Sequence, residues 1–163
     1  MVQFTVTDQF RELVPVRIED YQPAYGGRSV GLDLYSMANI EIPPLLSNPY
    51  WLSIELTHYK TLIPTGIKLK LPLNTQGLIL ERGSITKTPL KIRAGVVDPD
   101  YTDQVFINCI NLSAKTWRIK AGEKTPFQLV CTPTLAMRYI TENDYQANTK
   151  DSIRGTACLG STD

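Results

Sequence analysis

The chain has 163 residues, of which 42% are hydrophobic and 20% are charged, as is ordinary for one soluble globular domain. No stretch approaches the roughly 18 uninterrupted apolar residues that a membrane-spanning helix requires, so no membrane association is expected. Seventeen Lys and Arg residues against 16 Asp and Glu residues leave a net charge of +1, which gives no overall electrostatic basis for nucleic-acid binding.

The first residues, M-V-Q-F-T-V-T-D, do not form a secretory signal, so we expect an intracellular protein, cytoplasmic or nuclear. The three cysteines lack C-x-x-C spacing and favour neither a disulfide framework nor a zinc site. The single histidine, His58, excludes a multi-histidine metal site. Acid-base chemistry in this chain is therefore expected from carboxylates.

Short apolar runs between scattered prolines and glycines predict a mostly β protein. The clearest alternation is I-K-L-K-L, residues 67–71, which places three apolar side chains on one face and two lysines on the other. A short helix is expected only near residues 8–13. In chain order, the expected strands are residues 2–7, 30–36, 51–56, 67–71, 77–82, 105–112, 117–120 and 127–137. Several are apolar on both faces, which is typical of a sandwich or barrel.

From about residue 141 the chain becomes polar and weakly patterned. Such a tail is disordered by default. Its last ten residues, R-G-T-A-C-L-G-S-T-D, nevertheless combine an arginine, small residues and hydroxyls, which is the composition of a segment that wraps a phosphate. We therefore predict a β domain at residues 1–140 and a flexible C-terminal arm at residues 141–163.

The stretch A-G-V-V-D-P-D-Y-T-D-Q, residues 94–104, places charge between two apolar runs. A tight hairpin accounts for the Gly, Asp and Pro residues. A catalytic carboxylate at a strand end, Asp98, is the alternative. The stretch by itself leaves both interpretations open.

Five separated stretches combine small residues, hydroxyls and charges in the way that phosphate sites do. They are S-V-G-L-D-L-Y-S, E-R-G-S-I-T, A-G-V-V-D-P-D-Y, A-G-E-K-T-P-F-Q-L-V and the terminal R-G-T-A-C-L-G-S-T-D. In this order they resemble the five motifs of the trimeric dUTP diphosphatase (dUTPase) family, from about Pro23 to the last residue. The third motif and the terminal G-S-T are the most specific matches, and L-I-P-T-G-I-K-L-K-L-P resembles the strand between the first two motifs.

The resemblance implies a jelly-roll-like β subunit that forms a homotrimer and exchanges C-terminal arms. One chain would supply the first, second and fourth motifs of each active site, a neighbour the third, and the remaining chain the arm. The implied reaction is Mg²⁺-dependent hydrolysis of dUTP to dUMP and pyrophosphate, which keeps uracil out of DNA and supplies dUMP for thymidylate synthesis.

The resemblance also assigns roles to individual residues. Asp98 matches the general base that activates the attacking water, and Tyr101 matches the ring that excludes a ribose 2′-hydroxyl. Asp33 matches the carboxylate that holds Mg²⁺ through water. The implied substrate-binding residues are Arg82, Gly83, Ser84, Gly95, Val96, Val97, Gln128, Arg154, Leu159, Gly160, Ser161 and Thr162. Of these, Gly95, Val96 and Val97 would bind uracil through the main chain, and the two arginines would neutralise the triphosphate.

The sequence departs from the family pattern at four motifs. The second motif reads R-G-S, and the third continues D-Y-T-D, which adds the carboxylate of Asp103. The fourth motif is one residue longer between Gly122 and Gln128, which a β-bulge would absorb. Leu159 stands where the arm has an aromatic residue, and the lost stacking would weaken binding by about 1 kcal/mol.

Two other functions remain open at this point. The altered motifs suit a catalytically impaired regulatory or interaction protein, and the same fold also serves the dCTP deaminase class. An insertion that begins at Leu45 and ends at Lys60 is extra core or, alternatively, a surface for a protein partner. A virus- or phage-encoded origin is suggested by the resemblance alone.

Overall fold

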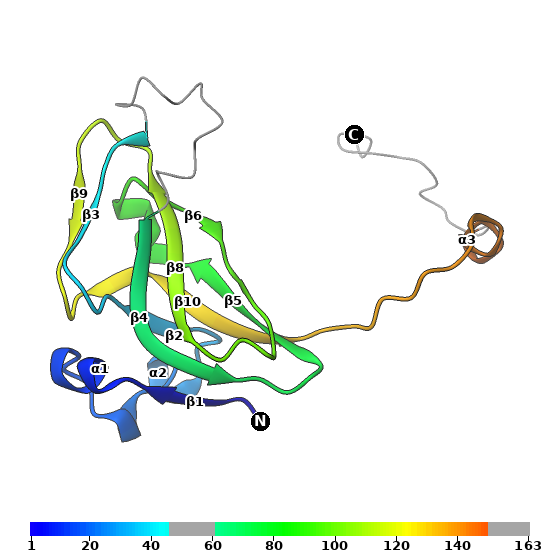
Figure 1. Cartoon of the computed structure of the whole chain (residues 1–163), viewed down its shortest axis with the longest axis horizontal. Coiled ribbons are helices and arrows are strands. Elements are labelled where there is room, and N and C mark those ends of the chain that lie inside the picture. Colours follow the sequence, from blue (N-terminus) through cyan, green and yellow to red (C-terminus); the bar gives the residue numbers. More distant parts are fainter. Residues whose placement is uncertain (46–60, 150–163) are drawn as a thin grey trace.

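The structure of the protein is a computed structural model that describes residues 1–45 and 61–149. Within these ranges the chain is built mainly of strands (Figure 1). The strands are β1 (Gln3–Val6), β2 (Leu32–Tyr35), β3 (Ile40–Ile42), β4 (Thr61–Lys70), β5 (Thr75–Glu81), β6 (Leu90–Ala94), β7 (Val96–Val97), β8 (Gln104–Asn111), β9 (Trp117–Ile119) and β10 (Lys124–Pro133). The helices are α1 (Asp8–Leu13), α2 (Ala24–Gly27) and α3 (Glu142–Thr149), with 3-10 turns η1 (Ile18–Asp20) and η5 (Gly83–Lys87).

Two four-stranded sheets form the body of the molecule. Their strand orders are β1-β4-β8-β6 and β2-β10-β5-β7, while β3 and β9 make a small two-stranded sheet. Most neighbouring strands are distant in sequence, which is the crossover pattern of antiparallel sandwiches. The predicted all-β, jelly-roll-like fold is confirmed.

Side-chain alternation explains how the sheets bury one face. On β4, Ile67 and Leu69 are buried and the lysines that follow each of them are exposed, as the sequence predicts. The strand is longer than predicted because it begins at Thr61. On β8 the odd-numbered residues from Val105 to Asn111 are buried and the even-numbered ones are half-buried. The inward-facing side chains of both sheets pack into one core around the fully buried Phe10 and Phe127.

The N-terminal helix also forms where it is predicted. Thr7 is its N-cap, and the Thr7 hydroxyl accepts a hydrogen bond of 3.3 Å from the backbone N–H of Phe10. Such a cap satisfies one of the free N–H groups of the first turn. Phe10 then anchors α1 in the core, against Tyr21 and Tyr35.

Several predicted boundaries are wrong. The strand expected at residues 127–137 is β10, which runs from Lys124 to Pro133, because its partner β5 begins at Thr75, opposite Pro133. The short strands β3, β6 and β7 are not predicted at all. With three, five and two residues they are too short to show alternation. The strand expected at residues 51–56 lies outside the described residues.

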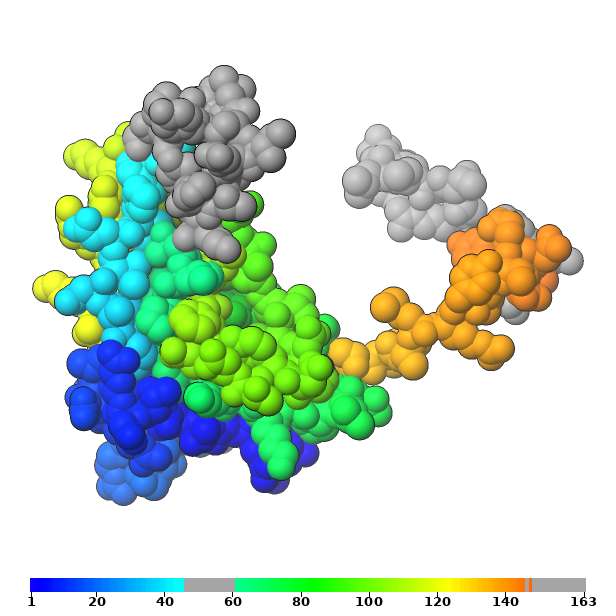
Figure 2. Space-filling view, in the orientation of Figure 1, coloured from blue at the N-terminus to red at the C-terminus, as the bar shows by residue number. Residues whose placement is uncertain are grey.

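After β10 the chain leaves the sheets. Leu135, Met137 and Tyr139 are 92%, 99% and 89% exposed, and the segment runs away from the body to α3 (Figures 1 and 2). Helix α3 lies in the stretch expected to be a weakly patterned tail, so part of that tail has regular structure. The boundary of the arm at residue 141 stays a prediction. In the two described ranges, no helix has both the length and the apolar character needed to cross a membrane.

Candidate active site

A pocket opens where the chain passes from one sheet to the other. Strand β6 pairs with β8 up to the contact of Ala94 with Asn108, with a register shift just before it. Gly95 then takes the chain to the other sheet, where its carbonyl accepts a 2.7 Å hydrogen bond from the N–H of Ile79. A side chain at this position would put its Cβ 2.5 Å from the carbonyl oxygen of Ile79, so the close approach requires glycine.

The separation of β7 from β8 leaves a pocket of about 260 Å³, here called the base pocket. It is lined by Leu62, Ile79, Ala94, Gly95, Val96, Val97, Asp98, Tyr101, Val105, Phe106 and Asn108. The lining is mainly apolar, with a few polar groups at the edges. This is the usual character of a pocket for a small ring.

Asp98 lies both in a turn and at the base pocket. The residue begins a turn, in which its carbonyl accepts a 3.2 Å hydrogen bond from the N–H of Tyr101. Its exposed carboxylate lies at the base pocket. The Tyr101 hydroxyl donates to the carbonyl of Gln104 at 2.9 Å, which fixes the ring beside the same pocket. The added carboxylate of Asp103 accepts from the N–H of Gln104 at 2.6 Å and is held by its own turn.

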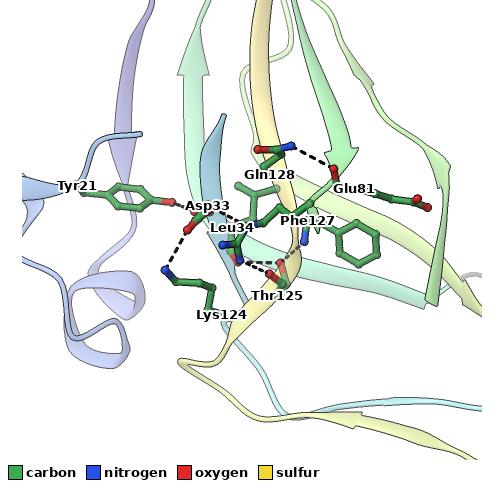
Figure 3. Close-up of polar contacts among 9 residues, drawn as sticks. Tyr21, Asp33, Leu34, Glu81, Lys124, Thr125, Phe127 and Gln128 are labelled. Atoms are coloured by element: carbon green, nitrogen blue, oxygen red, sulfur yellow. Dashed lines mark hydrogen bonds and ion pairs between the residues drawn. The ribbon is translucent and has the colours of Figure 1, made fainter. Parts of the chain in front are cut away.

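A second group of predicted residues gathers at the adjoining ends of β2, β5 and β10, and is here called the cation clamp. Asp33 Oδ1 lies 2.7 Å from Arg82 Nε, and Asp33 Oδ2 lies 3.0 Å from Lys124 Nζ. Figure 3 shows Lys124 directed at Asp33. The hydrogen bond from Lys124 to Asp33 raises the pKa of the Lys124 ammonium. Lys124 was not among the predicted site residues, although it lies within the fourth motif.

Backbone contacts hold the clamp in place. An Arg82 nitrogen donates to the carbonyl of Thr125 at 3.2 Å, and the Thr125 hydroxyl donates to the carbonyl of Leu34 at 2.8 Å. The hydroxyl of Tyr21 donates to the carbonyl of Asp33, and burial is the main reason that the pKa of Tyr21 is strongly raised. These hydrogen bonds hold the side chain of Arg82 and the backbone at Asp33 in place.

Gln128 lies opposite Asp33 in the register of β10 and β2. Its Nε2 donates to the carbonyl of Glu81 at 3.1 Å (Figure 3). A Cβ on Gly31 would come within 2.1 Å of Gln128 Oε1, so glycine at residue 31 makes room for this side chain. The register shift between Lys124 and Gln128 is the bulge expected in the longer fourth motif.

Glu81 connects the clamp to the strand that leads into the base pocket. Its carboxylate accepts from Lys91 Nζ at 3.0 Å and from the N–H of Ile92 at 3.1 Å. Burial tends to raise the pKa of Glu81, but these hydrogen bonds outweigh it and lower the pKa below the ordinary 4.5. Sequence reasoning missed this role, since Lys91 and Ile92 lie ten and eleven residues from Glu81 along the chain and no pattern links them.

The two groups do not meet within one chain. Arg82, Ser84 and Lys124 line a separate hollow of about 330 Å³, which shares no lining residue with the base pocket. Gly83 is exposed in the turn η5, whose residues Ser84 and Lys87 line the hollow at the clamp. The remaining predicted site residues, Arg154, Leu159, Gly160, Ser161 and Thr162, lie outside the described residues, as does nearly all of the insertion from Leu45 to Lys60.

The residues at Asp33 can be compared with the needs of Mg²⁺. The described residues contain no group of three or more His, Cys, Asp or Glu side chains that would hold a metal ion. Both oxygens of Asp33 are engaged by cations. One carboxylate fits a hydrated Mg²⁺ whose direct ligands come from substrate phosphates, because Mg²⁺ keeps waters and binds with few protein ligands.

A pocket for a flat ring and a clamp of fixed cations, carried on an antiparallel β sandwich, define a nucleotide-binding β protein. The chain belongs to the dUTPase family, whose model matches residues 18–163. The resemblance inferred from the five motifs is thereby confirmed.

Curated relatives of the chain are deoxyuridine 5′-triphosphate nucleotidohydrolases. The deoxyuridine 5′-triphosphate nucleotidohydrolase of Dictyoglomus turgidum is 33% identical over 142 residues, which cover 82% of this chain and 84% of that protein. The protein of the same name from Gloeothece citriformis is 30% identical over 135 residues, which cover 81% of each chain.

Solved structures share the fold. The dUTPase of Staphylococcus bacteriophage 80alpha with dUPNHPP has a TM-score of 0.72 and 19% identity, over 100% of this chain and 98% of that one. A mutant dUTPase from phage phi11 of S. aureus, studied for its coordination of a structural Mg(II) ion, has a TM-score of 0.65 and 18% identity, over 86% and 95% of the chains.

Proposed function

We propose that the protein hydrolyses dUTP to dUMP and pyrophosphate. Family membership and relatives named for this reaction support the proposal. The structural observation that carries it is the base pocket with Asp98 and Tyr101 at its edge, in a chain that also has the clamp of Arg82 and Lys124.

Asp98 acts as the general base. Its carboxylate takes a proton from a water molecule, the water oxygen bonds to the α-phosphorus, and the bond from that phosphorus to the bridging oxygen breaks. Pyrophosphate leaves with the electron pair of that bond. An exposed carboxylate on a short turn suits this role, since it can reach water and substrate together.

The clamp binds the triphosphate. Arg82 and Lys124 are held by Asp33 in the structure, and phosphate oxygens of higher charge would compete for both. Gln128 and the hydroxyl of Ser84 add neutral contacts, and Arg154, Ser161 and Thr162 join from the arm. Positive charge held at the clamp would stabilise the negative charge that develops in the transition state.

Mg²⁺ accompanies the triphosphate. It would neutralise phosphate charge, and Asp33 would hold it through water once Arg82 and Lys124 turn to the substrate.

The uracil base is recognised in the base pocket, where β7 separates from β8. Gly95, Val96 and Val97 line the pocket and would bind uracil through main-chain groups, while the ring of Tyr101, held beside the pocket, would exclude a ribose 2′-hydroxyl. Buried polar groups left unpaired by a wrong base cost affinity, so cytosine would be rejected, and the family resemblance implies a hairpin too tight for a 5-methyl group.

The active site is completed in a homotrimer. Two observations support this: the clamp and the base pocket lie in separate hollows of one chain, and the segment after β10 leaves the body with apolar side chains exposed. Contact with neighbours would join a clamp to a base pocket and cover Leu135, Met137 and Tyr139. The arm at residues 141–163 would then close over a neighbouring site.

The test is pyrophosphate release from dUTP with Mg²⁺, run beside dCTP, dTTP and UTP. Release confined to dUTP is expected, with a loss of roughly 10²–10⁴-fold in kcat for Asp98→Asn. Asp100→Asn, in the same turn, is the control and should retain turnover. No release from a folded trimer would contradict the proposal and favour a regulatory role instead.

A further inference from the structure

The base pocket contains a polar atom that the fold leaves without a partner. Among the buried side-chain nitrogen and oxygen atoms of the described residues, only Asn108 Oδ1 lacks a hydrogen bond. Buried polar groups are nearly always paired, so an exception calls for an explanation, and at a pocket a bound ligand can supply it. Asn108 lines the base pocket beside Gly95, Val96 and Tyr101.

The position of Asn108 follows from the sheet register. It is paired with Ala94, the last residue of β6 before the chain turns away at Gly95. Side chains of β8 alternate, so Asn108 lies on the same face as Phe106 and opposite to the buried Ile107 and Cys109. Phe106 also lines the pocket. An amide next to an aromatic ring suits a flat heterocycle with one polar edge.

A second asparagine on the same strand shows that the fold is able to satisfy this side chain. The amide of Asn111 donates to the carbonyl of Ile42 at 2.9 Å and to the carbonyl of Lys115 at 2.7 Å. Its oxygen accepts from the hydroxyl of Ser113 at 2.8 Å. Asn111 is therefore a structural residue, whereas Asn108 lines the pocket and has a buried acceptor without a partner.

We propose that Asn108 is a specificity-determining residue that binds the uracil ring of dUTP. Its Oδ1 accepts a hydrogen bond from N3–H, while its amide nitrogen donates to the adjacent ring carbonyl. In dUTP the ring nitrogen N1 carries the sugar, so N3–H is the only donor of the base. A carboxamide offers an acceptor and a donor side by side, which matches that edge. The inference rests on the proposed function and adds a side chain to the main-chain contacts.

Asn108→Leu tests the inference, because leucine keeps the volume and removes both polar atoms. We expect binding of dUpNHpp to weaken and KM for dUTP to rise by roughly fivefold to tenfold. Turnover at saturation should change little, since the reacting phosphorus is not touched. The unfolding temperature should not fall, because the substitution removes an unpaired buried atom. Ile110→Ala, on the same face of β8 but not lining the base pocket, is the control for binding.

A methylated substrate separates hydrogen bonding from shape. 3-Methyl-dUTP lacks the N3–H donor, and its steric cost is common to wild type and variant, so the cost cancels in a double-mutant cycle. The preference for dUTP over 3-methyl-dUTP should be several-fold larger in wild type than in Asn108→Leu. Equal preferences would overturn the inference.

Two further results have distinct meanings. A change of subunit assembly in sedimentation, with unchanged dUpNHpp binding, would overturn the inference by showing that Asn108 serves a subunit contact. A wild-type protein that binds dUpNHpp but releases no pyrophosphate would contradict the proposed reaction alone. The binding comparison between wild type and Asn108→Leu would still decide the role of the residue.

Discussion

Asp33 and Arg82 form an ion pair of 2.7 Å in which both side chains are largely buried, with 15% and 25% of their surfaces exposed. The pair joins β2 to the residue that follows β5. Arg118 and Glu41 form a pair of nearly the same length, 2.8 Å, but their side chains are 69% and 67% exposed. Distance alone therefore does not distinguish a clamp from a surface contact, whereas burial does.

This contrast gives a stability prediction. Asp33→Asn should lower the free energy of unfolding by roughly 1–3 kcal/mol, because it leaves two cations with a weaker partner. Glu41→Gln should change it by less than about 0.5 kcal/mol, because water already solvates that pair. Urea unfolding of both variants is the measurement, and equal losses would show that burial of the clamp has no energetic consequence.

Lys124 should contribute to substrate binding through its charge. Lys124→Ala is expected to raise KM for dUTP roughly tenfold or more, since a hydrogen bond to a charged phosphate is lost. Lys120→Ala removes the same charge from an exposed residue nearby and should have little effect. The measurement is KM for dUTP in both variants, by steady-state kinetics at several salt concentrations. Similar changes in both variants would indicate general attraction of the anion instead of a defined contact.

Gly31 should be required for the position of Gln128. In Gly31→Ala the new Cβ would displace the Gln128 side chain, from which it would lie 2.1 Å away. We expect kcat/KM for dUTP to fall to about the level of Gln128→Ala. The double variant should lose little more than either single variant, because both changes act on one side chain. Additive losses in the measured kcat/KM would contradict this coupling.

The carboxylate of Glu81 gives a prediction about pH. Its pKa is lowered in the folded protein by hydrogen bonds from Lys91 and from the N–H of Ile92, so its contribution to stability is present above pH 4.5 and is lost as pH falls through the lower, folded pKa. Wild type should therefore lose stability below pH 4.5 more steeply than Glu81→Gln. Urea unfolding from neutral pH down to about pH 3 gives the two slopes. Equal slopes for wild type and Glu81→Gln would contradict the predicted contribution of the Glu81 carboxylate to stability.

Sequence reasoning succeeded where a residue's neighbours along the chain decide its place. The alternation of Ile67 and Leu69 with lysines, and the cap at Thr7, act within one turn or one strand and are confirmed. It failed at the limits of β10, because the strand ends where its distant partner β5 begins. The short strands β6 and β7 exist only because neighbouring strands pair with them.

Some residues of the candidate site could be predicted from the sequence, and others could be recognised only in the folded chain. Asp33, Arg82 and Gln128 could be selected from motif order, and the structure brings them together. Lys124 and Asn108 could not, because a lysine and an asparagine on strands have many ordinary uses. Their significance comes from an ion pair and an unpaired oxygen, which are properties of the folded chain.

The sequence by itself determined the family, the all-β class and the residues with reactive groups, because motif order and alternation are written along the chain. The tertiary structure alone decided that the clamp and the base pocket occupy separate hollows, that Glu81 connects the clamp to β6, and that Asn108 lines the pocket with a buried oxygen left unpaired. These relationships join residues that are far apart in sequence. They depend on strand register and on which polar groups the fold leaves unpaired, and neither is encoded locally.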